Sequence, residues 1–415
     1  MGKLGVAGVA VAAVVLSAWL PSREAAAQDF GQNWIDRITH ELEQERGPLT
    51  AKPFNFTAEV GVGYAYDSNI YLAPSTSKIS DSIIVPFVQA GFTYGEPKFD
   101  LEASILANGK IYFKQTAADD DEERIFVRAR QTASRWNFEI SEMFQNVSDP
   151  SGALFSQRVS RVISNTIPKI AFDIGRQWAI ELGANLQLVR FEDATTSLAQ
   201  DNNSFTIDLT GVYRSAWGFD LLAQFGYQNL NYITAQTAGP ATGAPDFIGY
   251  YYRVGFRGQI VERLTLEALV GWQNVRTDFF LASGNQILDG TVRAVLNLRF
   301  EATEKINLYL DFARMYTFEG FTDPYQILNT AAAIAQMEFT EQFSLNIRAQ
   351  YDRSDSALAV RRSNYGGSAA ARYKVTSHLI LDVSAAYRGG NVSNAGGSSI
   401  SYTDFILSAG IAFGW

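Results

Sequence analysis

Hydrophobic and polar residues alternate with a period of two along most of this 415-residue chain. The clearest run is residues 99–113, where the odd-numbered positions from Phe99 to Phe113 are apolar or small and the even-numbered positions are mainly polar or charged. Successive side chains of a β-strand point to opposite faces, so the run predicts a strand with one apolar face. Strands of soluble proteins average about five or six residues. A longer strand divided in this way predicts water on one side and an apolar solvent on the other.

The same alternation recurs as far as the last residue. Further examples are residues 179–191, 205–214, 217–228, 290–301, 343–352 and 404–415. Short turns are expected at residues 96–97, 135–136, 175–177, 216–217, 262–263, 303–305, 340–342 and 376–377. Longer polar loops are expected at residues 70–80, 115–123, 149–157, 194–202, 234–249, 279–286, 319–324, 354–363 and 389–400. These connections predict about eighteen strands, and sixteen is the alternative because residues 158–174, with Pro168, and 325–340 have the weakest pattern.

An all-β fold, a transmembrane antiparallel β-barrel over residues 54–415, explains this pattern best. Lipid offers the backbone no hydrogen bonds, so sheets cross it only when closed. Short turns that alternate with long loops are typical of outer-membrane barrels, whose short turns face the periplasm. A chain of soluble sandwiches or a propeller explains neither the loop lengths nor the continuous apolar face. Aromatic residues near strand ends are expected in interfacial girdles: Tyr64, Tyr66, Trp136, Trp178, Trp217, Tyr250, Tyr252, Trp272 and Tyr316.

The amino-terminal residues have a different character. Residues 1–27 contain Lys3, an apolar stretch of moderate length and three consecutive alanines, which predicts a secretory signal peptide. Residues 28–53 are expected to form a periplasmic leader with a short amphipathic helix at 33–46. This leader is read either as a plug or docking arm, or as a simple solvated segment.

Composition excludes several classes of function. The chain has no cysteine, two histidines, and 34 basic against 43 acidic residues, for a net charge of −9. Disulfide scaffolds and thiol catalysis need cysteine, and the acidic balance argues against nucleic-acid binding. We therefore expect no enzyme activity, no cofactor and no metal site. The five carboxylates of segment 119–124 are expected in a solvated acidic loop, with Ca²⁺ or Mg²⁺ binding as the alternative.

Two segments resemble known outer-membrane proteins. The last strand resembles the assembly signal of Gram-negative outer-membrane barrels, carried by Leu407, Ile411, Phe413 and Trp415. This resemblance implies export to the cell outer membrane, contact with lipid and lipopolysaccharide, and recognition by the barrel-assembly machinery. The stretch Tyr66-Asp67-Ser68-Asn69 resembles the opening of the beta-barrel porin type-two family, some of whose members are associated with exopolysaccharide export. It implies no particular site residues.

The polar faces of the strands supply the candidate functional residues. Charged positions expected to line a pore are Arg128, Arg130, Arg253, Arg257, Arg293, Arg299, Arg348, Arg372, Glu102, Glu181, Asp208, Asp220, Glu267 and Asp311. Barrels of this size enclose an aqueous channel, although the same groups could form ion pairs that hold the wall. The sequence thus predicts a porin-like channel for passive diffusion of small polar or anionic solutes. The alternatives are an export conduit for a secreted polysaccharide, or a structural or adhesion barrel with a blocked lumen.

Overall fold

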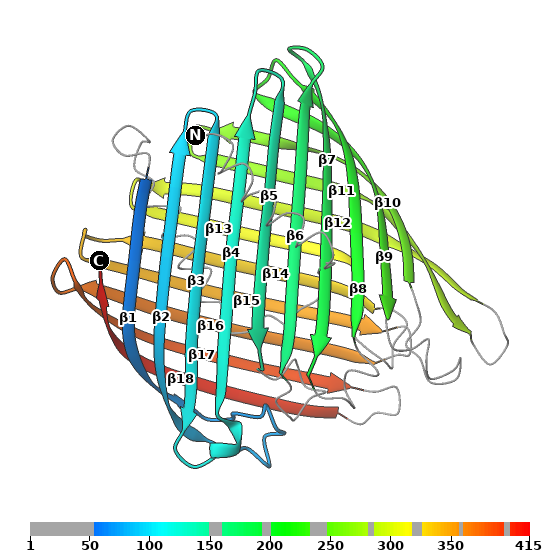
Figure 1. Cartoon of the computed structure of the whole chain (residues 1–415). Coiled ribbons are helices and arrows are strands. Elements are labelled where there is room, and N and C mark those ends of the chain that lie inside the picture. The colour runs from blue at the N-terminus through cyan, green and yellow to red at the C-terminus, as the bar shows by residue number, and fades with distance from the viewer. Residues whose placement is uncertain are drawn as a thin grey trace.

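Eighteen β-strands form one antiparallel sheet that closes on itself (Figure 1). The structure is a computed structural model that describes residues 54–148, 160–192, 201–232, 247–280, 286–317, 326–356, 360–393 and 399–415. Consecutive strands pair throughout, and β1 pairs with β18 to close the barrel. The prediction of eighteen strands is confirmed, and the alternative of sixteen is wrong. The predicted signal peptide and leader lie outside the described residues.

The strands are long, from 12 to 18 residues. Their bounds are β1 (Phe54–Asp67), β2 (Asp81–Glu96), β3 (Phe99–Tyr112), β4 (Asp120–Thr132), β5 (Trp136–Val147), β6 (Arg161–Asp173), β7 (Trp178–Phe191), β8 (Asn202–Arg214), β9 (Phe219–Tyr232), β10 (Phe247–Val261), β11 (Leu264–Phe280), β12 (Gln286–Thr303), β13 (Ile306–Thr317), β14 (Gln326–Glu338), β15 (Phe343–Ser356), β16 (Arg361–Lys374), β17 (Leu379–Ser393) and β18 (Ser399–Gly414). A single 3-10 turn, η1 (Thr116–Ala118), is assigned among the described residues. They contain no helix long and apolar enough to cross a membrane.

The two faces of the sheet differ as the alternation predicts. On one face large apolar side chains stand exposed; Val60, Val88 and Val254 are 45%, 52% and 60% exposed. On the other face charged groups meet across the wall. Arg372 of β16 donates to Glu59 of β1 at 2.7 Å, although β17 and β18 lie between these strands. A contact over two intervening strands requires a concave surface, so the polar face is the inside of the barrel.

All eight predicted short turns connect strands at one end of the barrel. In the turn between β8 and β9, Gly218 has a φ of 85°, a conformation that side chains disfavour. The two weakest strand predictions are also confirmed, as β6 and β14. Pro168 lies within β6, and the pairing with β7 skips from Thr166 to Lys169 because proline has no N–H to donate.

At the other end, the strands extend further than the apolar pattern indicates. Segment 119–124 was expected to be a solvated loop, and this prediction is wrong for all but its first residue, because β4 begins at Asp120. Glu122 lies on the inner face, where it accepts hydrogen bonds from Lys110 Nζ at 2.5 Å and Asn108 Nδ2 at 3.3 Å. Strand pairing thus continues past the apolar band of the barrel. Beyond that band both faces of a strand carry polar side chains, so the sequence no longer alternates and does not predict the strand. No group of three or more metal-ligating side chains is found among the described residues.

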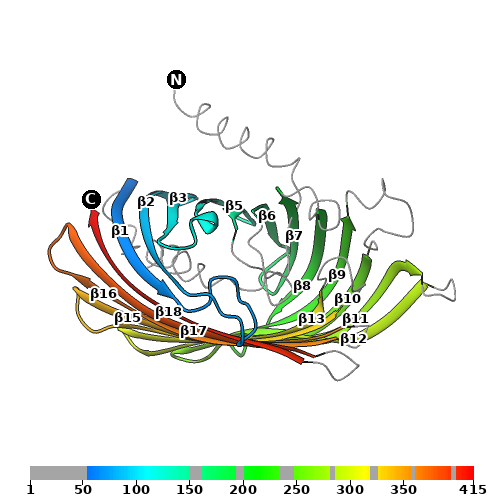
Figure 2. The same ribbon diagram turned by 90° about the horizontal axis from the view of Figure 1, so that it is seen from below.

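The wall is two layers thick where β13 separates from β12. The two strands pair only as far as Ala294 and Arg314, after which β12 continues beside β11 and β13 beside β14. Arg314 Nη2 donates to Thr291 Oγ1 at 3.3 Å, and Thr291 belongs to the inner face of β12. The end of β13 therefore runs along the inside of the β11–β12 hairpin, which projects beyond it in Figure 2. Tyr316 is fully buried in this overlap, so the prediction that it joins an aromatic girdle is wrong.

Candidate functional site

The strand register places all fourteen predicted pore-lining residues on the inner face. Cross-strand partners share a face, and the chain of partners can be followed around the barrel from Glu59. For example, Glu102 pairs with Arg128, and Asp220 pairs with Arg257. This placement satisfies the geometry that a lining residue needs, and solute contact stays a prediction.

Ion pairs join many of these residues near the end with the short turns. Arg128 donates to Glu102 at 2.6 Å, Arg130 to Glu139 at 2.7 Å, and Arg257 to Glu181 at 2.9 Å. Further pairs in the same region are Arg214–Asp173 at 2.5 Å, Arg257–Asp220 at 3.4 Å, Arg299–Glu301 at 3.1 Å, Arg372–Glu59 at 2.7 Å and Arg372–Asp382 at 3.9 Å.

This ring of pairs bears on the alternative between pore lining and wall support. The exposed pairs, such as Arg299–Glu301, contribute about 0–1 kcal/mol each, whereas loss of one partner from a buried pair such as Arg128–Glu102 would leave an uncompensated charge in the wall. The pairs also cancel most of the local charge, because each arginine in the ring has a carboxylate beside it. The same side chains thus support the wall and present a polar surface to the interior.

A cavity of about 630 Å³ lies against this part of the wall, between β4 and β11. Its charged lining has three cationic side chains, Arg130, Lys169 and Arg257, and four carboxylates, Glu139, Glu181, Asp208 and Glu267. Amide and hydroxyl groups complete the polar lining: Thr132, Asn137, Thr210 and Gln224. Such a mixture of donors and acceptors suits small hydrogen-bonding solutes better than apolar ones.

Further along the barrel, two predicted arginines surround a buried tyrosine. Tyr251 is 1% exposed, and its hydroxyl donates to Asp208. The guanidinium carbon of Arg293 lies 3.8 Å from the centre of the Tyr251 ring, and that of Arg253 lies 5.2 Å from it. A Cβ on Gly226 would collide with this ring, so the glycine makes the space in which it lies.

Glutamine side chains, rather than carboxylates, hold these two arginines. Arg253 Nε donates to Gln224 Oε1 at 2.8 Å, and Arg293 Nη1 donates to Gln273 Oε1 at 3.2 Å. Gln273 also donates from Nε2 to Gln228 Oε1 at 3.2 Å, which extends the network from β12 to β9. Sequence reasoning missed Tyr251 and the glutamines. The sequence did contain a signal for Tyr251. Three consecutive tyrosines stand at 250–252, so an aromatic residue occupies a position where the alternation calls for a polar one.

Two loops at the opposite end fold against the inner face. Ile70, in the loop after β1, is fully buried against the inward side chains Ala65, Ile83 and Tyr112 and against Ala118 of η1. Figure 2 shows η1 on the inner side of β3. Asp81 Oδ2 accepts from the backbone N–H groups of residues 114 and 115 at 2.9 and 2.7 Å, which fixes the second loop. Both loops narrow this mouth of the barrel.

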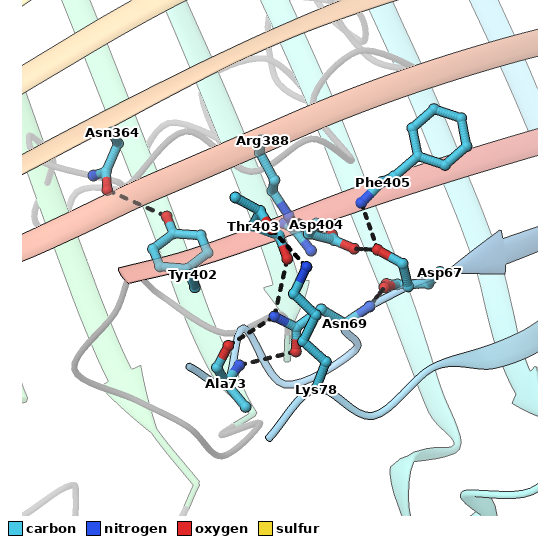
Figure 3. Close-up of polar contacts among 11 residues, drawn as sticks. Asp67, Asn69, Ala73, Lys78, Asn364, Arg388, Tyr402, Thr403, Asp404 and Phe405 are labelled. Atoms are coloured by element: carbon cyan, nitrogen blue, oxygen red, sulfur yellow. Dashed lines mark hydrogen bonds and ion pairs between the residues drawn. The ribbon is translucent and has the colours of Figure 1, made fainter. Parts of the chain in front are cut away.

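The Asp67-Ser68-Asn69 stretch locks the first loop to β18 (Figure 3). Asn69 Nδ2 donates to the carbonyl oxygens of Ala73 at 2.8 Å and Thr403 at 3.2 Å, and Asn69 Oδ1 accepts from the Ala73 N–H at 3.0 Å. Ser68 Oγ donates to Asp404 Oδ1 at 2.9 Å, and Asp404 Oδ2 accepts from Arg388 Nε at 2.8 Å. The motif behind the type-two resemblance therefore has a local structural role in this chain.

The remaining predicted residues do not line the cavity. Leu407, Ile411, Phe413 and Trp415 point outward from β18 and are 47%, 38%, 50% and 67% exposed. Arg348 and Asp311 face the interior from β15 and β13, away from the cavity lining. The other eight aromatic residues expected in girdles are exposed, from Trp272 at 38% to Trp217 at 79%.

No family model matches this chain, and no curated protein matches it. Among solved structures, the outer membrane protein OpdK from Pseudomonas aeruginosa is 13% identical, with a TM-score of 0.44 over 87% of this chain and 99% of that one. The FrpB iron transporter from Neisseria meningitidis is 8% identical, with a TM-score of 0.44 over 88% and 82%. OccK2 (OpdF) from Pseudomonas aeruginosa, in complex with glucuronate, is 13% identical, with a TM-score of 0.44 over 87% and 98%. Likeness this distant carries no conclusion about activity, and the barrel assignment rests on the strand pairing of the chain itself.

Proposed function

We propose that this chain is a porin-like channel of a Gram-negative outer membrane, through which small polar or anionic solutes diffuse passively. One observation carries the proposal: a closed eighteen-stranded sheet exposes large apolar side chains along the outer face of its described strands and encloses a charged, hydrogen-bonding inner face. In water such an outer face would drive aggregation, whereas in lipid it is the stable arrangement.

The dimensions of the strands support the placement in a membrane. A tilted strand needs about 9–11 residues to cross the hydrocarbon region, and every strand here has at least 12. Trp136 and Trp178 lie on the outer face at the first residues of β5 and β7, where an interfacial girdle is expected. By the usual topology the short turns face the periplasm and the long loops face the outside.

The interior supports diffusion rather than tight binding. A barrel of eighteen strands is wide enough for an aqueous channel, and within the described part of the chain the inward-folded loops lie at the long-loop end. Arg130, Lys169 and Arg257 border the polar cavity together with four carboxylates, so both hydroxyl groups and anionic groups of a solute would meet hydrogen-bonding partners there. The compensating carboxylates keep these interactions weak enough for the solute to leave.

The partners expected for such a protein follow from the same placement. The exposed aromatic and aliphatic positions of β18 are available to the barrel-assembly machinery, and the outer face is available to lipid and lipopolysaccharide. Membership of the type-two porin family stays a prediction that rests on the stretch Tyr66–Asn69.

Swelling of proteoliposomes in isotonic solutions of graded solutes tests the proposed function. We expect rapid swelling with monosaccharides and small carboxylates, and slower swelling as the solute grows. Swelling that appears only after removal of residues 28–53 would favour a gated export conduit for polysaccharide. A folded, inserted protein that permits no swelling in either form would contradict the channel and favour the structural or adhesion barrel.

A further inference from the structure

Two arginines on the outer face at the long-loop end share one carboxylate. Arg353 donates from Nε and Nη2 to Asp355 at 3.1 and 3.2 Å, and Arg361 donates from Nε to the same carboxylate at 2.8 Å. The register places all three side chains outward, on the adjacent strands β15 and β16. The side chains of Arg353 and Arg361 are 40% and 59% exposed. The cluster carries a net charge of +1 on a surface that otherwise faces lipid.

Tyrosine rings lie just below this cluster on the same face. Tyr351 pairs with Tyr365 across β15 and β16, and Tyr387 of β17 lies 6.2 Å from Tyr365 between ring centroids. The three rings are 45%, 43% and 44% exposed. Outward tyrosines near strand ends mark the boundary between hydrocarbon and headgroups. Arg353 follows Tyr351 by two residues, or about 7 Å along the strand, so the guanidinium groups lie at the level of the lipid headgroups.

We propose that Arg353 and Arg361 bind the phosphate of a phosphorylated lipid in the outer leaflet of the membrane. The inference rests on the proposed membrane placement, with the long loops outside. Within the described part of the chain, Nη1 and Nη2 of Arg361 and Nη1 of Arg353 have no protein acceptor. Guanidinium groups present these N–H donors as a fork that matches phosphate oxygens.

Asp355 preorganises this pair of arginines for binding. Its carboxylate holds both guanidinium groups in place and offsets their mutual repulsion, so that neither side chain must be ordered when the lipid arrives. Another outward arginine at this end shows the contrast. Arg190 of β7 donates from Nη1 to the carbonyl oxygens of Val189 and Asn202, at 2.9 and 3.2 Å, and from Nη2 to Asn203 Oδ1 at 3.2 Å, so both of its terminal nitrogens are occupied by protein acceptors.

Native mass spectrometry of the whole protein, extracted from outer membranes in mild detergent, tests the site. We expect the wild-type barrel to retain a bound lipid with the mass of lipid A. Each basic group near a membrane surface contributes on the order of fivefold in lipid affinity, so the double variant R353Q/R361Q should lose about 25-fold. The matched control R176Q/R263Q removes the same charge from turns at the opposite end and should retain the lipid.

Heat-modifiable migration on gels establishes that each variant is folded, and swelling of proteoliposomes reports the channel separately. Normal swelling of R353Q/R361Q with loss of the lipid supports the site. Equal lipid retention by R353Q/R361Q and the control, or a wild-type barrel that carries no phosphorylated lipid, overturns it without touching the proposed channel. Binding of inorganic phosphate by a barrel that retains no lipid would also overturn it, because the site would then bind free phosphate.

Discussion

The side-chain oxygen of Gln273 accepts a hydrogen bond from the backbone N–H of Tyr316 at 3.3 Å. Tyr316 lies where β13 has left β12, so the neighbouring strand no longer supplies an acceptor. Gln273 is fully buried, and the same oxygen accepts from Arg293 Nη1 at 3.2 Å. One glutamine side chain therefore takes the place of a strand partner and closes the overlap in the wall.

Substitution of Gln273 by leucine should destabilise the barrel by about 2–4 kcal/mol, because two buried donors lose their acceptor. The free energy of unfolding, measured by urea titration in detergent with tryptophan fluorescence, checks this. Gln259, exposed near the short turns, provides the control, and Q259L should change stability by less than about 0.5 kcal/mol. Equal effects of the two substitutions would show that Gln273 does not close the wall.

Substitution of Gly226 by alanine should displace the Tyr251 ring, because the new methyl group would overlap it. We expect a loss of about 1–3 kcal/mol that largely disappears in a Tyr251→Ala background. A double-mutant cycle of unfolding free energies measures this coupling. Gly183→Ala is the control, since its Cβ would meet nothing within 4 Å. Additive effects of G226A and Y251A would contradict the contact.

Arg299 is the accessible position for changing ion selectivity. Its side chain is 52% exposed on the inner face and lies 3.1 Å from Glu301. Reversal of its charge by R299E should lower the chloride-to-potassium permeability ratio on the order of twofold, as measured by reversal potentials in a salt gradient. The buried Arg293 is different, because R293E would place a carboxylate against Gln273 and should impair folding. An unchanged reversal potential for R299E would remove this residue from the conducting path.

Release of the first loop should widen the mouth. Asn69→Ala removes the hydrogen bond to Thr403 of β18 and the two hydrogen bonds to Ala73 that shape the loop, or about 1–3 kcal/mol of local stability. We expect a larger and noisier single-channel current. The control Ser77→Ala removes one exposed hydrogen bond to Pro74 and should leave the current unchanged. If the current of N69A equals that of wild type, the loop does not narrow the channel.

The alternation predicted the strands and their faces because each strand has an apolar environment on its outer face and a polar environment on its inner face. Successive residues therefore differ in polarity. The run 99–113 shows it, since the odd-numbered residues from Phe99 to Ile111 face outward and the even-numbered residues from Asp100 to Tyr112 face inward. Where the outer surroundings are polar, the contrast vanishes. Asp120 to Arg124 were for that reason expected in a loop, although they pair with β3.

Side-chain contacts between strands could not be predicted from the sequence, because the alternation gives the face on which a residue lies but not its neighbours on other strands. That Arg257 meets Glu181, 76 positions earlier, depends on the register of four strands. The inward course of Tyr316 depends on where β12 and β13 stop pairing, which no local pattern records. The sequence showed Asn69 only as part of a motif, and it did not show that Asn69 bonds Thr403 of β18.

The current through single barrels in a planar lipid bilayer tests the central claim most directly. If the closed sheet surrounds water, each insertion of detergent-extracted, heat-modifiable protein should add a stable step of conductance that rises in proportion to the conductivity of the salt. Folded protein that inserts and yet passes no current at any salt concentration would contradict the account.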